Sequence, residues 1–262
     1  QVLSLSGGGD TAYKRDNTTI VFLAADADYL PVIAAIDTSG NWEVIHEEDP
    51  WPEDNSVGVY TPLSSGGAVR GGWRHTEVEA GENHEPEYDI YKYPVLYGLD
   101  QNHALQWSIQ PRPGRSGSFS HAVEMGDDQL LAGGRLLYDD WFYGTYLAKV
   151  TADGAVVWQR FYGFNNVVYL VDVTPVGGDY LLTTNCGNAY GASNGCLARV
   201  DGEGTLRWRW ETQHSGSAQF FDAIETVSGD YVFAGGEDDG VPADGIGDRI
   251  WLVKLTPNEE CY

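Results

Sequence analysis

The chain has 262 residues, of which 42% are hydrophobic, and this is enough to build the core of one large domain or of two smaller ones. Lys and Arg number 15 against 39 Asp and Glu, and the formal net charge of −24 excludes nucleic acids and anionic membranes as partners because they would be repelled. No segment approaches the ~18 consecutive apolar residues of a membrane helix, so we expect no membrane insertion.

The acidic residues are spread along the whole chain and are not gathered in one patch. This distribution favours adaptation to high salt, a halophilic property, because counterions screen the repulsion between carboxylates. A cationic partner is the alternative explanation. The chain begins with Gln1, and we expect a secreted protein whose signal peptide has been removed.

The first half of the chain contains two degenerate copies of a repeating unit. Apolar runs at 19–25 and 32–36 precede a turn at 37–40, and runs at 68–72 and 95–99 precede a turn at 100–103. These runs are short and show no helical periodicity, so we expect β-strands. The acidic insertion from Glu77 to Asp89 is predicted to be a solvated loop, and a cation site is the alternative.

The second half contains three clear copies. Their first apolar runs begin at residues 128, 179 and 230, so that successive copies are 51 residues apart. A variable loop and a second apolar run follow in each copy, at 146–150, 196–200 and 251–255. Asp-Gly and Glu-Gly pairs follow two of these runs and supply the positive φ that tight hairpins require.

Four short strands repeated every ~40–55 residues predict an all-β fold, a five-bladed β-propeller of four-stranded antiparallel blades. We expect a single domain over 1–262, with blades at about 10–50, 56–112, 119–163, 168–212 and 219–262. The last blade lacks its outermost strand. The alternating segment within residues 1–8 is predicted to supply that strand and to close the ring without an open edge.

The repeat also carries a family resemblance. The Asp222-Ala223 pair, the Asp-Tyr turn at 230–231, the Ala-Gly-Gly strand end at 234–236 and the Leu-Val-Lys-Leu run resemble repeats of bacterial and archaeal secreted propellers related to the quinoprotein-like (PQQ-type) group. The resemblance is clear over 119–260 and weak over 1–118. It implies a propeller in a secreted or surface protein and no particular activity, since the cofactor site of quinoprotein enzymes is not recognisable.

The cysteines indicate the compartment. Cys186 and Cys196 are ten residues apart across a loop rich in Gly, Asn and Ser, and we predict a disulfide between them, which favours an extracellular location. Three cysteines are too few for a zinc or haem site. Cys261 is predicted to be free or to pair outside the domain.

Three polar residues hold similar positions ahead of the aligned strands of consecutive units, namely His121, Asp172 and Asp222. If these strands line the central channel, the side chains converge there and could hold a metal or the hydroxyls of a sugar. The alternative is that each side chain caps its own blade with hydrogen bonds.

Aromatic residues fall into two groups. Trp107, Trp158 and Trp208 recur at one blade position and are predicted to pack between neighbouring blades. By contrast, candidate ligand-binding aromatics lie beside carboxylates outside this register, at Trp51, Asp140, Trp141 and Tyr143. Such pairs stack on sugar faces and also anchor protein interfaces.

One loop is a candidate metal site. It contains Asp238, Asp239, Asp244 and Asp248 with interleaved glycines. Flexible acidic loops of this kind bind calcium, which is the only cofactor that the sequence suggests. The loop does not follow EF-hand spacing, and a solvated turn is the alternative.

The sequence contains no nucleophile elbow, no His-Glu-x-x-His motif and no phosphate loop. We therefore expect a non-catalytic recognition or structural module outside the cell or on a cell or virion surface, with a protein or glycan partner or with self-assembly. A lectin-like propeller is one alternative. A glycoside hydrolase-like enzyme with a carboxylate pair at the channel top is another.

Overall fold

The computed structural model describes residues 12–14, 19–25, 31–47, 54–77, 90–110, 116–126, 128–139, 142–163, 169–187, 193–212, 217–238 and 248–256. All the regular elements in these ranges are β-strands, which confirms the all-β prediction. Within the same ranges there is no helix long and apolar enough to cross a membrane.

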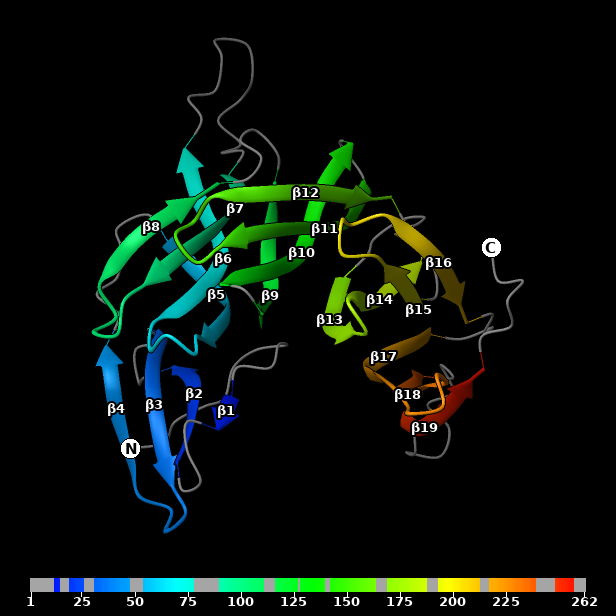
Figure 1. Cartoon of the computed structure of the whole chain (residues 1–262), viewed down its shortest axis with the longest axis horizontal. Coiled ribbons are helices and arrows are strands. Elements are labelled where there is room, and N and C mark those ends of the chain that lie inside the picture. The colour runs from blue at the N-terminus through cyan, green and yellow to red at the C-terminus, as the bar shows by residue number, and fades with distance from the viewer. Residues whose placement is uncertain are drawn as a thin grey trace. The chain divides into compact units, whose positions relative to one another are not determined.

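The strands form five sheets in which strands adjacent in sequence are neighbours (Figure 1). The first sheet consists of β1 (Ala12–Lys14), β2 (Thr19–Ala25), β3 (Pro31–Asp37) and β4 (Trp42–Glu47). The second consists of β5 (Asp54–Pro62), β6 (Ala68–Glu77), β7 (Ile90–Leu99) and β8 (Leu105–Ile109). The third consists of β9 (Gly117–Met125), β10 (Gln129–Asp139), β11 (Phe142–Thr151) and β12 (Val156–Tyr162). The fourth consists of β13 (Tyr169–Val176), β14 (Asp179–Gly187), β15 (Ser193–Val200) and β16 (Leu206–Glu211). The fifth consists of β17 (Ser217–Glu225), β18 (Tyr231–Asp238) and β19 (Asp248–Leu255).

The chain divides into two compact units. The first comprises 1–132 and 150–156, and the second comprises 133–149 and 157–262, so that residues of the third sheet fall in both. Residues 1–11 and 257–262 lie outside the described ranges. The single domain, the ring closed by residues 1–8 and the state of Cys261 therefore stay predictions.

The turn between the third and fourth strands of a sheet is capped in a repeated way. In the first sheet, Asp37 Oδ1 accepts hydrogen bonds from the backbone N–H of Ser39 (2.8 Å) and Asn41 (2.9 Å). In the fourth sheet, Asp201 Oδ1 does the same for Glu203 and Thr205. These side chains satisfy backbone donors that a tight turn leaves without strand partners, which explains why Asp recurs at the turn.

A left-handed residue completes each of these turns. Gly40, Gly154 and Gly204 have φ values of +82°, +87° and +78°, where a Cβ atom would be strained. In the second sheet the corresponding residue is His103, with φ +60°, and its Nδ1 lies 3.2 Å from Tyr60 Oη. The predicted turns are thus confirmed, and the positive φ belongs to a glycine in three of them and to His103 in the second sheet.

The repeated tryptophans pack against the following sheet, as predicted, and two of them dock on its turn. Trp107 Nε1 donates a hydrogen bond to Ala152 O (2.8 Å) in the first unit. Trp158 Nε1 donates to Gly202 O (3.0 Å) in the second. Trp208 instead packs edge-on against Tyr231, with ring centroids 5.1 Å apart.

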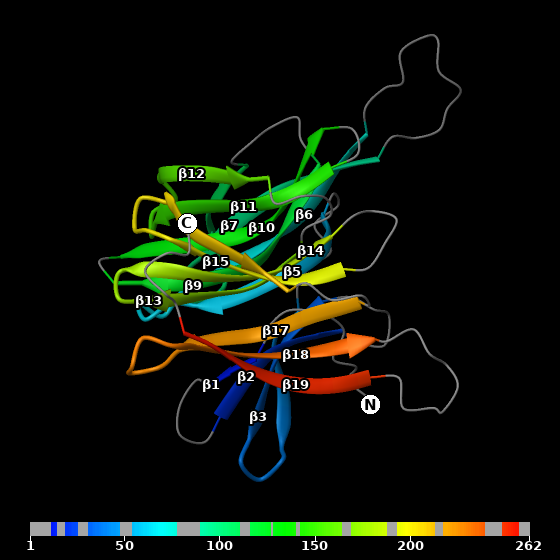
Figure 2. The ribbon, with the colours of Figure 1, turned by 90° about the vertical axis from the view of Figure 1, so that its right-hand side faces the viewer.

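The strands β17, β18 and β19 of the fifth sheet lie side by side (Figure 2). The core of the second unit includes the space between this sheet and the fourth sheet. Phe220 and Phe233 of the fifth sheet are fully buried, and Trp210 of the fourth lies over both. Ion pairs join aligned residues of the repeat, from Arg199 to Asp179 (2.8 Å) and from Lys254 to Asp230 (2.6 Å).

Candidate active site

Two of the predicted carboxylates occupy equivalent positions on the first strands of two neighbouring sheets. A β-bulge separates Leu170 from Asp172 in β13, and another separates Phe220 from Asp222 in β17. A bulge inserts one residue and changes the direction of the side chains that follow, and it is a common device beside active sites. Because the repeat places a bulge before each aspartate, β13 and β17 present the two carboxylates in the same way.

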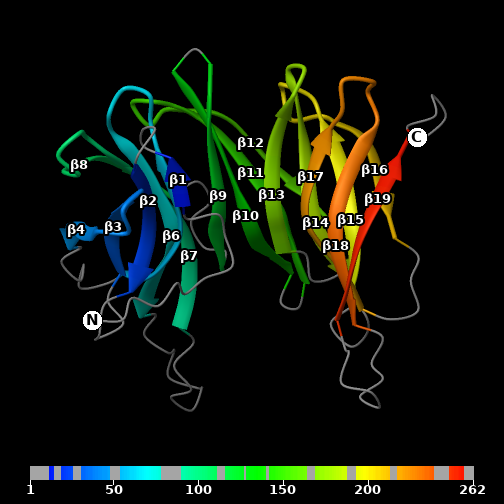
Figure 3. The ribbon, with the colours of Figure 1, turned by 90° about the horizontal axis from the view of Figure 1, so that it is seen from below.

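These two strands are neighbours within the second unit (Figure 3). Thr174 Oγ1 lies 2.6 Å from Asp172 Oδ2 and 3.1 Å from Ala223 O, so one hydroxyl joins the first carboxylate to the backbone beside Asp222. Asp222 Oδ1 accepts a hydrogen bond from the Ala223 N–H at 2.7 Å. Asp172 is half-buried and Asp222 is exposed, so both carboxylates are open to solvent to some degree.

The same strand-to-strand contact recurs in the first unit, where Thr61 Oγ1 donates to Ala122 O (2.7 Å). His121 immediately precedes Ala122, and its buried imidazole has Nδ1 3.4 Å from Ser120 Oγ. His121 belongs to the first unit, whereas Asp172 and Asp222 belong to the second. The predicted convergence of all three in one channel therefore stays a prediction.

Tyr143 is the one member of the predicted aromatic–carboxylate group within the described ranges, since Trp51, Asp140 and Trp141 lie outside them. The guanidinium carbon of Arg135 lies 5.1 Å from the centre of the Tyr143 ring, a cation–π contact. One face of this ring is therefore covered by an arginine, which leaves only the other face for a sugar.

The candidate metal loop lies between β18 and β19. The backbone pairs Asp238 with Asp248 at the loop end of this hairpin, so the two ends of the loop are directly opposite each other. Asp239 and Asp244 lie outside the described ranges. Calcium binding by this loop stays a prediction.

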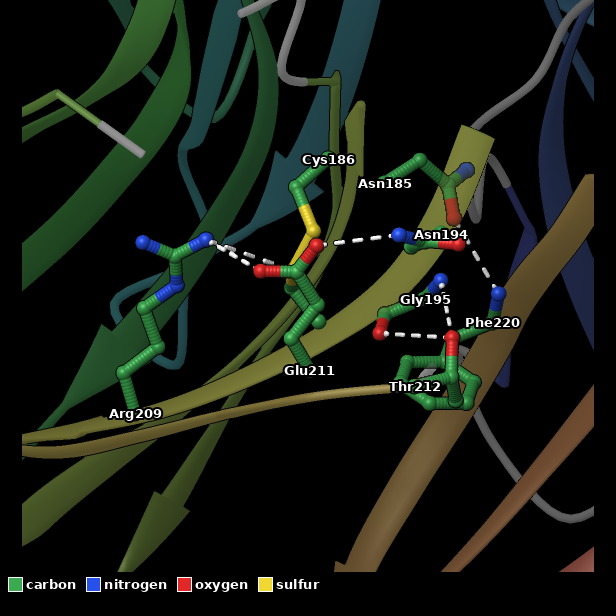
Figure 4. Close-up of a disulfide and its surroundings, with 9 residues drawn as sticks. Asn185, Cys186, Asn194, Gly195, Arg209, Glu211, Thr212 and Phe220 are labelled. Carbon is green, nitrogen blue, oxygen red and sulfur yellow. Dashed lines mark hydrogen bonds and ion pairs between the residues drawn. A yellow bond between two sulfur atoms is a disulfide. The ribbon is translucent and has the colours of Figure 1, made fainter. Parts of the chain in front are cut away.

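The predicted disulfide between Cys186 and Cys196 is confirmed (Figure 4). The register pairs Thr184 with Cys196 and Cys186 with Asn194, so the cysteines are diagonal neighbours on β14 and β15, with Cα atoms 5.9 Å apart. Both are buried. The bridge thus joins paired strands beside the Gly- and Asn-rich loop from which it was predicted.

A polar cluster beside this disulfide was not predicted. Glu211 accepts hydrogen bonds from Asn194 Nδ2 (2.9 Å) and from Arg209 Nη2 (2.8 Å), as Figure 4 shows. Potential ligand atoms of Cys186, Cys196 and Glu211 lie within 4.8 Å of one another. Because metals are bound by thiolates and these sulfurs form a disulfide, we assign the cluster a structural role.

No protein-family model and no curated protein matches the chain. Solved structures do. A polysaccharide lyase of family PL25, an ulvan lyase, matches with a TM-score of 0.58 and 10% identity over 96% of this chain and 69% of its own. An endo-arabinase from Bacteroides thetaiotaomicron matches with a TM-score of 0.54 and 7% identity over 99% of this chain and 97% of its own. An exo-β-1,3-galactanase from Phanerochaete chrysosporium, solved with galactose, matches with a TM-score of 0.52 and 11% identity over 98% of this chain and 64% of its own.

The chain has the β-propeller fold. The predicted fold class is thereby confirmed, whereas the closure of five blades into a ring stays a prediction. The resemblance to quinoprotein-like repeats is not supported, because the matched propellers act on carbohydrates. At 7–11% identity the likeness to them is one of fold.

The prediction that this propeller is not an enzyme is contradicted by the same comparison, since all three matched structures are enzymes. It rested on the absence of contiguous catalytic motifs. That inference fails for a propeller, because functional groups on different blades meet in space without forming a motif in the sequence.

Proposed function

We propose that this propeller is an enzyme that cleaves glycosidic bonds of a polysaccharide, with Asp172 and Asp222 as its catalytic carboxylates. The observation that carries the proposal is the pair of equivalent bulged positions on the adjacent strands β13 and β17. The first strands of propeller blades surround the central channel, where a glycan has access. The fold shared with carbohydrate-active propellers supports the same assignment.

A pair of carboxylates is what glycoside hydrolysis requires. One carboxylic acid protonates the glycosidic oxygen, and the other carboxylate activates water or attacks the sugar directly. Equivalent positions on two packed sheets are separated by roughly the sheet spacing of ~10 Å. This is closer to the ~6.5–9.5 Å of inverting enzymes, which place a water between sugar and base, than to the ~5–5.5 Å of retaining enzymes.

The net charge of the protein favours one class of polysaccharide substrate over another. With a charge of −24, the protein repels uronate-rich or sulfated polysaccharides and slows their association, especially at low salt. A neutral glycan experiences no such repulsion. We therefore favour hydrolysis of a neutral polysaccharide over cleavage of an acidic one.

An extracellular location belongs to this proposal. The Cys186–Cys196 disulfide suits an oxidising compartment, and polysaccharides of cell walls and matrices are reached there. We also propose that the protein is adapted to high salt, because its net charge is −24.

The proposal is tested by incubating the protein with arabinan, β-1,3-galactan and ulvan and by measuring new reducing ends and, for ulvan, unsaturated uronate ends. We expect reducing ends from a neutral glycan. Asp172→Asn and Asp222→Asn should each lower kcat by about 10²–10⁴-fold. Glu203→Gln, which removes an exposed carboxylate from a turn of the fourth sheet, is the matched control and should leave kcat unchanged. Failure to cleave any of these glycans, or full activity in both Asn variants, would overturn the proposal.

A further inference from the structure

One hydroxyl group stands in the core of the fourth sheet at a position that the repeat otherwise fills with alanine. The aligned runs at 128–134, 179–185 and 230–236 place Ala132, Thr183 and Ala234 at the same position. The Thr183 side chain is fully buried, with 0% of its surface exposed. The fold therefore does not need a hydroxyl here, and of these three sheets only the fourth has one.

The register places this hydroxyl next to the candidate catalytic carboxylate. Thr183 of β14 is the direct cross-strand partner of Asp172 in β13, so the two side chains extend from the same face of the sheet. This face is turned toward the fifth sheet. Thr174, two residues from Asp172, contacts Ala223 O, and Leu181, two residues from Thr183, packs in the cluster with Phe220.

The Thr183 hydroxyl has no hydrogen-bond partner in the described structure. A buried hydroxyl without a partner is destabilising, so such groups are normally satisfied by protein or by an ordered water. Cβ atoms of directly opposed residues are ~4.5–5.5 Å apart. A threonine and an aspartate at this separation that do not bond directly can be bridged by one water.

We propose that Asp172 and Thr183 hold a water molecule between them and that this water is the nucleophile of the hydrolysis described above. A buried water needs two to four polar partners, and the Thr183 hydroxyl and the Asp172 carboxylate supply them, with Thr174 Oγ1 beside the carboxylate. Thr183 is then a positioning residue, and Asp172 is the general base. The assignment of the water as the nucleophile rests on the proposed function.

The chemical step balances with these groups alone. The water oxygen bonds to the anomeric carbon as the bond from that carbon to the glycosidic oxygen breaks. Asp172 takes a proton from the water, and Asp222 gives a proton to the departing oxygen. Proton exchange with solvent restores both groups, and each turnover consumes one water.

A matched control lies one residue away. Thr184 is also fully buried and its hydroxyl also lacks a partner in the described structure, but its cross-strand neighbours are Leu170 and Cys196. Neither of these direct partners carries a carboxylate, and the carboxylate of Glu211, one strand beyond Cys196, already accepts hydrogen bonds from Asn194 and Arg209. Thr183→Val and Thr184→Val therefore make the same chemical change on the same strand, and only the first removes a water ligand.

The first experiment is a crystal structure at a resolution that shows ordered water. We expect a water within ~3.2 Å of both Thr183 Oγ1 and an Asp172 carboxylate oxygen, and none in that position in Thr183→Val. A site without water, or a direct bond between the two side chains, would overturn the proposal whatever the activity of the protein.

The second experiment compares the valine variants in solution. Replacing an unsatisfied hydroxyl by a methyl group of the same shape is neutral or stabilising, so Thr184→Val should keep or raise the melting temperature. Thr183→Val should lower it by about 2–4 °C, because the water loses a ligand and the carboxylate loses a partner. Equal shifts in the two variants would contradict a water at Thr183.

The third experiment uses the glycan that the wild type cleaves. Thr183→Val should lower kcat by about 10–100-fold with KM unchanged, Thr183→Ser should retain activity, and Thr184→Val should match the wild type. Unchanged kcat in Thr183→Val, with Asp172→Asn inactive, would remove the role of the water and leave the proposed function intact. If the wild type is inactive on arabinan, β-1,3-galactan and ulvan, the proposed function fails, and a water found in the crystal cannot be a nucleophile.

Discussion

Replacing Gly154 by alanine tests the docking of Trp107 on the turn of the following sheet. Gly154 has φ +87°, and an ideal Cβ atom on it would lie 2.7 Å from Trp107 Cδ2 and 2.8 Å from Cγ. These atoms are at the root of the indole ring, so a small rotation of the side chain cannot clear them. Moving the whole ring would also stretch the hydrogen bond from Trp107 Nε1 to Ala152 O.

The magnitude follows from two contributions. The left-handed conformation costs alanine about 1–2 kcal/mol relative to glycine. The clash with the indole adds about 1–3 kcal/mol, the usual cost of an extra methyl group in a packed site. Gly40 provides the control, since its φ is +82° and nothing lies within 4 Å of its ideal Cβ. We therefore expect Gly40→Ala to lower the free energy of unfolding by about 1–2 kcal/mol and Gly154→Ala by about 2–5 kcal/mol.

The assay is equilibrium unfolding in urea, followed by far-ultraviolet circular dichroism, with each variant fitted to its own folded and unfolded baselines. A Trp107→Ala background completes a double-mutant cycle. Without the indole, Gly154→Ala should cost no more than Gly40→Ala. Equal costs of the two glycine changes in the wild-type background would show that Trp107 does not pack on this turn.

Three further predictions concern the disulfide, acid and salt. Reduction of Cys186–Cys196 should lower the free energy of unfolding by roughly 2–3 kcal/mol, and peptide mapping without reductant should find both buried sulfurs protected from alkylation; two alkylated thiols would contradict the bridge. The hydrogen bond from Lys254, with help from Ser228 and Thr256, lowers the pKa of Asp230 to about 2, so its stabilising contribution is present above the unfolded pKa of ~3.9 and is lost as pH falls toward 2. Measured in molar NaCl, the loss of stability between pH 5 and pH 2 should be smaller in Asp230→Asn, and an equal loss would contradict the ion pair. Raising NaCl from about 0.05 to 2 M should raise the melting temperature because the Debye length falls below the spacing of surface carboxylates, and a flat response would reject salt adaptation.

The features that the sequence predicted well are those set by neighbouring residues. The turn at 201–204 follows from an Asp that caps backbone N–H groups and a Gly that accepts positive φ, and both properties belong to the residue types. The Cys186–Cys196 bridge follows in the same way from two cysteines beside one flexible loop. Because the same pattern of strands and turns recurs along the chain, it predicted the all-β fold correctly.

The site depends on relations that a single sequence does not display. Asp172 and Asp222 were chosen because they are aligned, but the bulges that set their direction come from the pairing of β13 with β14 and of β17 with β18. Whether His121 meets them depends on how the two units are placed. A motif search cannot find such a site, and for this reason the absence of motifs was wrongly taken to exclude catalysis.

The proposed role of Thr183 depends both on the repeat alignment and on the strand register. The aligned repeats already show that threonine replaces an alanine of the neighbouring copies, and a hydroxyl in a buried strand is costly unless something binds it. Only the register adds that the residue across from it is Asp172 and not Leu170. In a repeat protein, the departures from the repeat in the core are therefore the positions to examine for function, because identical copies already satisfy the fold.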